Sequence, residues 1–451
     1  MERVEKGRTE RFFLRSLPYL VAILFVLAIE FLYFGTGLPL TMVVFVIVAL
    51  LAMGVFLARP YLAILALFVV KPILDTMWGV NVGGMKGTYI MGVLGPLLWA
   101  FGMLYFRVSP LNYKLGRVMI FWGACCLIPM ILAPFSWSYY PGNMWMTGIN
   151  MSMRLVNGWG FFFLIPFLVK EKRDFNLFLY AWLASTAIPA LLGLYYLVTS
   201  NPAGFQITAG WWRIAGPYHD ATAFMTEITP ALPVMLYLAS GTKRWWKRAL
   251  WLIPVVAWLF LAFNAYTRSF WIATSIVLIL WVFARLWQPA IMALIGILYK
   301  WPLIWKRFTT AGLEDLESTY ALGGRVGLWK DFWRVFKQST VLDKILGGWA
   351  GIKGFEWLDY HNQYLIMIDN MGLVGLAGFI GILVGFLYHL IRDIFTHPAW
   401  RREVLLGLSV LTVVVVLSVS GRFLMVPNNQ WFFFGFMGLI INRNFDAGLS
   451  S

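Results

Sequence analysis

Residues 363–391, QYLIMIDNMGLVGLAGFIGILVGFLYHLI, decide the fold class of this chain. A run of this length with so few charged side chains is what a membrane-spanning helix requires, since about 20 apolar residues cross the hydrocarbon core. Apolar runs of this kind recur from Leu17 to Ile441. The first of them, Leu17–Phe34, is long enough to span and precedes no small-residue cleavage site, so we expect it to stay as a transmembrane helix.

The composition supports the same class for the whole chain. Hydrophobic residues make up 61% of the sequence and charged residues 12%, which is about half the charged share of an ordinary soluble domain. A β-barrel would instead show short alternating strands. We therefore expect an all-α polytopic integral membrane protein, with residues 1–451 in a single transmembrane helical bundle of about 12–14 transmembrane helices.

Two of the expected spans are weak. Tyr61–Val70 is short, and Pro289–Trp305 contains Lys300 and Pro302, so either could be re-entrant or interfacial. In chain order, the expected spans are Leu17–Phe34, Pro39–Leu57, Tyr61–Val70, Tyr89–Phe106, Val118–Pro134, Leu155–Val169, Phe175–Val198, Ala221–Ala239, Ala249–Tyr266, Ser269–Leu286, Pro289–Trp305, Gln363–Ile391, Val404–Val419 and Gln430–Ile441.

The net charge of +16 is spread over short connections rather than gathered on a polar domain. By the positive-inside rule these basic clusters mark the cytoplasmic face, which places residues 306–360 outside. Nucleic-acid binding is not expected because no domain presents a groove, whereas membrane lipids are expected partners. The basic residues concerned are Arg3, Lys6, Arg8, Arg11, Arg15, Lys170, Lys172, Arg173, Lys243, Arg244, Lys247, Arg248, Arg401 and Arg402.

Residues 306–360 form the one large extracytoplasmic loop that we expect. Within it, Leu328, Phe332, Val335 and Phe336 recur at helical spacing among charged residues. This pattern predicts an amphipathic helix on the outer surface.

Four basic side chains are expected to face one cavity on the outer side. Arg213 precedes the span that starts at Ala221, Arg268 lies in a hairpin, Arg325 opens the loop helix and His361 precedes the span from Gln363. A guanidinium matches phosphate oxygens and stays charged, and an imidazole exchanges a proton near neutral pH. The sequence therefore favours chemistry on an anionic, membrane-bound substrate.

Structural roles are open for the same residues. A single arginine at a helix end, such as Arg213 or Arg268, is commonly an interface anchor, and a histidine beside Asn362 can cap a helix. Cys125 and Cys126 are adjacent in an apolar run and are expected to be core residues rather than a disulfide or a metal site. No nucleotide loop or zinc motif stands in a suitable context, so we expect a donor that is already activated rather than charged by ATP, and no cofactor.

Several blocks together resemble the O-antigen ligase and O-antigen polymerase superfamily. The resemblance covers about residues 210–420, and its most specific part is residues 361–375. It rests on Arg213-Ile214-Ala215-Gly216-Pro217, Thr267-Arg268-Ser269, Gly324-Arg325 with Trp329, His361-Asn362-Gln363-Tyr364-Leu365 and Asp369-Asn370-Met371-Gly372-Leu373-Val374-Gly375.

The resemblance implies a metal-independent inverting glycosyltransferase of the bacterial cytoplasmic (inner) membrane whose site faces the periplasm. Its donor would be a glycan on undecaprenyl diphosphate, held by Arg268 and Arg325, with Arg213 as a further diphosphate contact. His361 would orient or deprotonate the acceptor hydroxyl, and both roles are open. Asn362 and Trp329 are the remaining expected substrate-binding residues, and a chain-length regulator protein is an implied partner.

The acceptor differs within this superfamily. We favour a polymerase of O-antigen or exopolysaccharide, and the alternative is a ligase that transfers the finished glycan to lipid A core. An alternative of another class is a solute transporter of the bicarbonate kind, for which Lys71, Asp75 and Glu227 would line a path. A lipid flippase would require a cavity through the membrane rather than a one-sided site.

Overall fold

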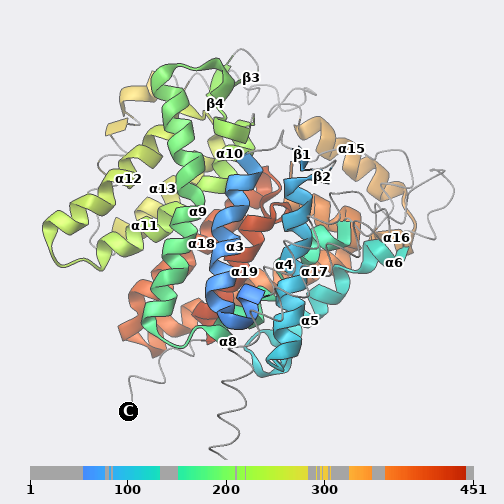
Figure 1. Ribbon diagram of the computed structural model, residues 1–451. Coiled ribbons are helices and arrows are strands. Elements are labelled where there is room, and N and C mark those ends of the chain that lie inside the picture. The colour runs from blue at the N-terminus through green and yellow to red at the C-terminus, as the bar shows by residue number, and fades with distance from the viewer. Residues whose placement is uncertain are drawn as a thin grey trace, which may run out of the picture.

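The structure is a computed structural model, which describes residues 54–76, 81–82, 85–132, 151–208, 211–218, 220–282, 291, 295–296, 298–302, 305, 325–347 and 361–442. It is nearly all helical (Figure 1). Six described helices are long and apolar enough to cross a membrane: Met151–Leu168, Lys172–Thr199, Ala221–Ser240, Trp245–Asn264, Gln363–Thr396 and Arg401–Ser420. This confirms the predicted class of an all-α polytopic membrane protein.

Six predicted spans overlap these helices: Leu155–Val169, Phe175–Val198, Ala221–Ala239, Ala249–Tyr266, Gln363–Ile391 and Val404–Val419. Gln430–Ile441 falls on the helix Pro427–Asn442. Shorter apolar helices account for others: Pro60–Pro72, Leu94–Tyr105, Gly116–Leu132 and Arg268–Val282. Leu17–Phe34 lies outside the described residues, as do most of Pro39–Leu57 and part of Pro289–Trp305. The predicted total of 12–14 spans stays a prediction.

The first half of the chain contains these elements: α3 (Pro60–Thr76), β1 (Asn81–Val82), β2 (Met85–Lys86), α4 (Gly87–Tyr105), η2 (Pro110–Asn112), α5 (Gly116–Cys125), α6 (Ile128–Leu132), α8 (Phe161–Leu168), α9 (Lys172–Thr199), η4 (Pro202–Gly204), β3 (Phe205–Thr208), β4 (Trp211–Ile214) and η5 (Gly216–Tyr218). The strands form two antiparallel hairpins, and Phe205 pairs with Ile214 in the second.

The second half contains α10 (Ala221–Ile228), α11 (Ala231–Ser240), α12 (Trp245–Asn264), α13 (Arg268–Val282), α15 (Arg325–Gln338), α16 (Val341–Leu346), α17 (Gln363–Thr396), η8 (Pro398–Trp400), α18 (Arg401–Ser420), η9 (Phe423–Met425) and α19 (Pro427–Asn442). The predicted amphipathic loop helix is present as α15, with Phe332 and Val335 on its buried side.

The core is built around α19, which lies in the middle of the bundle (Figure 1). An all-round apolar helix is stable only when protein or lipid covers every face, and α19 packs with α8, α3 and α18. Its Phe432 stacks on Trp182 of α9 with ring centroids 5.0 Å apart, and also packs edge-to-face on Phe68 of α3 at 4.9 Å. Cys125 and Cys126 are buried, as predicted for core residues.

The peripheral helices expose apolar side chains instead of polar ones. Leu191 of α9 is 64% exposed, Ile253 of α12 62% and Val384 of α17 58%. Apolar side chains exposed along successive helices form a surface that is suited to lipid rather than water.

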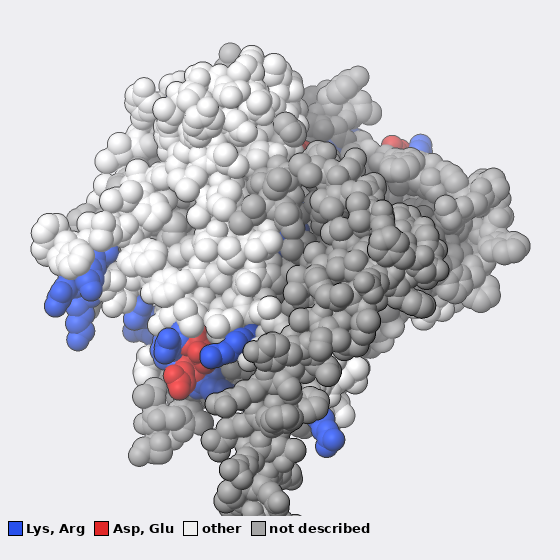
Figure 2. All heavy atoms as spheres, viewed as in Figure 1, with Lys and Arg blue, Asp and Glu red and all other residues white. Residues whose placement is uncertain are grey.

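The bundle has two chemically different ends. Helices α9, α12 and α18 each begin beside exposed basic residues, and these gather along the lower part of the face shown in Figure 2. We call this the basic end. The chain then alternates in direction, so that α9, α12 and α18 finish at the opposite end, where α13, α17 and α19 begin. We call that the site end.

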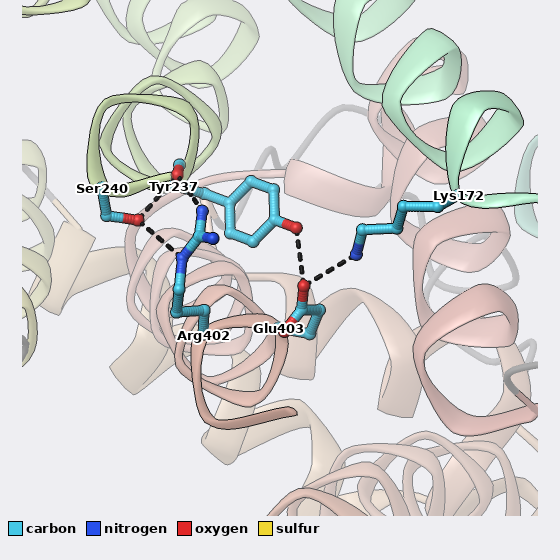
Figure 3. Close-up of polar contacts among 5 residues, drawn as sticks. All are labelled: Lys172, Tyr237, Ser240, Arg402 and Glu403. Atoms are coloured by element: carbon cyan, nitrogen blue, oxygen red, sulfur yellow. Dashed lines mark hydrogen bonds and ion pairs between the residues drawn. The ribbon is translucent and has the colours of Figure 1, made fainter. Parts of the chain in front are cut away.

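At the basic end a polar cluster joins three helices (Figure 3). The buried Glu403 of α18 accepts hydrogen bonds from Lys172 Nζ of α9 and from the Tyr237 hydroxyl of α11, both at 2.7 Å. Arg402 donates to Ser240 Oγ (3.1 Å) and to the Tyr237 carbonyl (2.9 Å). None of these five side chains has a buried polar atom without a partner. The buried polar atoms of the cluster therefore find their hydrogen-bond partners within the fold, and their bonds hold α9, α11 and α18 together.

Candidate functional site

The residues singled out by sequence gather at the site end. The β3–β4 hairpin, α10 and α15 lie toward the top of the view in Figure 1, away from the basic end. The turn between α12 and α13, the start of α17 and the end of α18 belong to the same end because these helices alternate in direction. The expectation that the four basic side chains face one cavity stays a prediction.

Arg213 fastens strand β4 to the α12–α13 turn. Its side chain is buried, its Nε donates to the Ala265 carbonyl at 3.0 Å and its Nη2 donates to Thr267 Oγ1 at 2.5 Å. The Thr267 hydroxyl in turn donates to the Ala265 carbonyl at 3.1 Å. Two donors of the Arg213 fork are thus used within the fold, directly beside Arg268.

Arg268 is the first residue of α13 and is only partly exposed. Its Nη1 is buried and has no hydrogen-bond partner among the described residues. The preceding Tyr266 has a positive φ of 48°, and burial raises the pKa of its hydroxyl, which stays protonated at neutral pH. The turn therefore presents a guanidinium with unused hydrogen-bonding capacity beside a strained, neutral tyrosine.

His361 stands directly before α17 in a left-handed conformation, with φ at 45°. The next residue, Asn362, is the N-cap: its Oδ1 accepts from the backbone N–H of Tyr364 (2.9 Å) and of Leu365 (3.2 Å). The cap role that the sequence left open for His361 therefore belongs to Asn362. Since a non-glycine residue seldom adopts positive φ, the backbone of the half-buried His361 is held in this conformation by its surroundings.

Helix α15 is seated on the first turns of α17. Phe332 and Val335 pack in one buried cluster with Leu365, Ile366 and Ile368. Trp329 packs against the same cluster, so this expected substrate-binding residue has a packing role as well. Arg325, at the start of α15, lies one helical turn before Trp329 and is half-buried.

A close backbone contact fixes the loop to α17. The helix is kinked at Gly372, whose φ of 65° and ψ of −167° are open almost only to glycine. A methyl group there would overlap the carbonyl of Ile345 at the end of α16, and one on Gly347 would overlap the backbone of Gly372. The glycine in the block 369–375 therefore has a structural reason: it lets α16 dock on the kink.

A second polar layer at this end involves residues that the sequence analysis did not place in the site. The buried Glu227 of α10 accepts from Asn428 Nδ2 at 2.5 Å. Asn429 donates to the Thr226 carbonyl at 3.3 Å, and Gln430 accepts from the Gly158 N–H at 2.8 Å. In the sequence, the feature that could have indicated this layer is the run of three amide side chains, Asn428, Asn429 and Gln430, at the start of an apolar helix. The transporter hypothesis assigned Glu227 to a solute path, whereas here it connects α10 to α19.

The other residues of that hypothesis are only partly described. Lys71 is buried, with its Nζ 5.9 Å from the centre of a Trp431 ring. The Asp75 side chain lies outside the described part of the structure. Within the described residues, no group of three or more His, Cys, Asp or Glu side chains is placed to hold a metal ion.

The predicted site residues thus form two local groups. Arg213 bonds to the α12–α13 turn directly before Arg268, while His361, Asn362, Arg325 and Trp329 belong to the α15–α17 pair. Helices α13 and α17 both pack along α18, which brings the two groups to the same end of the bundle. No protein-family model matches this chain, and a search of curated proteins found no significant similarity.

Proposed function

We propose that this protein is a membrane glycosyltransferase that acts on a glycan carried by undecaprenyl diphosphate, and that it polymerises O-antigen or exopolysaccharide repeat units. The observation that carries the proposal is the buried, unpartnered Nη1 of Arg268. A buried donor on a charged group is costly to leave unpaired, about 1–3 kcal/mol or more. An anionic ligand at the end of a lipid-facing bundle would supply its partner.

The arginines suit the leaving group of such a reaction. As the glycosidic bond to the lipid diphosphate breaks, negative charge grows on the departing phosphate oxygens. Arg268 and Arg325 would bind these oxygens and stabilise that charge, as fixed donors do in an oxyanion hole. Arg213 acts through the turn: it holds the backbone next to Arg268 in place.

His361 would act on the other substrate. An acceptor hydroxyl attacks the anomeric carbon from the face opposite the diphosphate, so the configuration inverts. The neutral imidazole accepts the hydroxyl proton as the new glycosidic bond forms. The strained conformation of His361 supports this role, because strain at one residue commonly accompanies function.

The charge distribution supports an orientation for the site. The basic end would face the cytoplasm, and the site end would face the periplasm of a bacterial inner membrane. The lipid tail of the donor would then reach the site through the bilayer along the exposed apolar surface. A chain-length regulator would be a protein partner, and a second lipid-linked repeat unit, rather than lipid A core, would be the acceptor.

Reconstituted full-length protein, given a labelled lipid-linked repeat unit, tests the proposal. Wild type should produce a ladder of products, and Arg268→Lys and Arg325→Lys should each lower turnover by about 10²-fold or more, since an ammonium lacks the planar fork. Arg402→Lys is the matched control, because Arg402 is an arginine of the basic end; turnover is compared at equal amounts of folded protein, since Arg402 also bonds Ser240 and Tyr237. No product from wild type with several donors, or equal loss in Arg402→Lys, would contradict the proposal. Product formed only with core lipid would identify a ligase.

A further inference from the structure

Beside Arg268, other side chains at the site end carry buried polar atoms that lack a partner among the described residues. They include Nε2 of Gln363, Oγ of Ser418 and Oγ of Ser269, and also Oγ1 of Thr274 and Oδ1 of Asn428. Gln363 and Ser418 are each fully buried, and no other polar contact is made by these atoms. Leaving buried hydrogen-bonding atoms unpaired costs folding free energy, so each is a candidate for a ligand contact.

The packing of α13 against α18 places the Ser269 and Ser418 hydroxyls at similar heights along the helix axes. Trp281 Nε1 of α13 donates to Ser409 Oγ of α18 at 3.0 Å, which fixes the antiparallel register of the two helices. With a rise of about 1.5 Å per residue, Ser269 and Ser418 lie about 18 Å and about 14 Å from that pair toward the site end. Measured along the helix axes, Ser269 and Ser418 are thus about one helical turn apart.

Gln363 lies at about the same height along the helix axes as Ser418. Its neighbour Tyr364 donates to the Val415 carbonyl of α18 at 3.3 Å, and its own Oε1 accepts from the Leu424 N–H at 3.1 Å. Val415 and Leu424 lie on either side of Ser418 in the chain. Because a backbone N–H requires an acceptor, this bond also fixes which end of the amide is the oxygen, so Nε2 is the unused donor.

We propose that Gln363 Nε2 and Ser418 Oγ form a subsite for a sugar of the acceptor, next to His361. The inference rests on the proposed transferase function. Charged guanidinium donors suit the diphosphate, whereas a neutral amide and a hydroxyl suit the hydroxyl and ring oxygens of a sugar. Both side chains are buried, so in this proposal the acceptor reaches them when the helix ends around them separate.

A pair of serines on α18 gives a matched test in the reconstituted full-length protein. Ser418→Ala removes an unpartnered hydroxyl, so its melting temperature should equal or exceed that of wild type, while the KM for the acceptor should rise about tenfold. Ser409→Ala removes the partner of Trp281, so its melting temperature should fall with unchanged kinetics. Gln363→Met should raise the acceptor KM as well, and should also destabilise the fold because Leu424 N–H loses its partner.

Two readouts separate this subsite from the proposed function. The donor KM should stay the same in Ser418→Ala, and a rise in the donor KM alone would overturn the assignment to the acceptor. The second readout is thermal stabilisation by the repeat-unit oligosaccharide without its lipid, which should occur in wild type and Ser409→Ala but be weaker in Ser418→Ala.

If wild type transfers no glycan but shows this pattern of stabilisation, the transferase proposal fails and the sugar subsite stands. If wild type transfers glycan and Ser418→Ala and Gln363→Met, once folded, keep the wild-type acceptor KM, the subsite is wrong and the transferase stands. Absence of both transfer and stabilisation overturns both.

Discussion

The Nη2 of Arg213 lies 2.5 Å from the Oγ1 of Thr267, across 54 residues of sequence. This contact joins the end of the β3–β4 hairpin to the turn from which Arg268 begins α13. It gives a buried arginine a definite role: it positions a second arginine instead of lying at an interface as an anchor.

Replacing Arg213 by lysine should weaken this connection between the β3–β4 hairpin and the α12–α13 turn. A lysine cannot donate both to the Ala265 carbonyl and to Thr267 from fixed positions, so the free energy of unfolding should fall by about 1–3 kcal/mol. Chemical unfolding of Arg213→Lys, Thr267→Val and the double variant measures the coupling between the two side chains. Additive losses would show that the contact contributes nothing to stability.

His361 allows its imidazole to be removed without backbone strain. Glycine adopts the observed φ of 45° at little cost, whereas alanine there should cost about 1–2 kcal/mol. His361→Gly and His361→Ala should therefore both lose glycan transfer while retaining donor binding, and the alanine variant, which keeps the strained conformation, should unfold more easily than the glycine variant. Product from His361→Gly at the wild-type rate would remove the imidazole from the mechanism.

Gly372 and Gly381 lie on the same helix and should respond to alanine in opposite ways. Gly372→Ala places a methyl group against the Ile345 carbonyl in a glycine-only conformation, which should cost about 1–3 kcal/mol and release α16. At Gly381 the added methyl group would meet only Val118 at 3.4 Å, and alanine should be neutral or favourable by up to about 1 kcal/mol. Thermal unfolding and glycan transfer of the two variants are the measurements. Similar losses of stability and glycan transfer in both variants would mean that the contact between α16 and the kink contributes no more than an ordinary helix position.

The orientation of the bundle can be read from two introduced cysteines. Val341 on α16 is 72% exposed, and Lys243 is exposed at the basic end, while the native Cys125 and Cys126 are buried. In cells whose outer membrane is permeable, an impermeant thiol reagent should label Val341→Cys and should not label Lys243→Cys. The reverse labelling would show that the site end faces the cytoplasm.

The local pattern of the sequence determined much of this protein. The apolar run from Gln363 predicted α17, because a helix that must lie in lipid requires a continuous apolar stretch, which is visible in a single segment. The spacing of Phe332 and Val335 predicted α15 and its buried face for the same local reason. Clusters of basic residues likewise predicted one chemically distinct end of the bundle.

The tertiary structure alone decided what the polar residues do. Lys172 and Glu403 meet across 231 residues, and Gln363 and Leu424 across 61, and no local pattern encodes such pairs. A residue type states only which hydrogen bonds are possible; the packing of distant helices decides which are made. For this reason the sequence drew attention to Arg213 and His361, but the helix packing showed that Arg213 is used within the fold, and that Gln363 and Ser418 are left with unused hydrogen-bonding atoms.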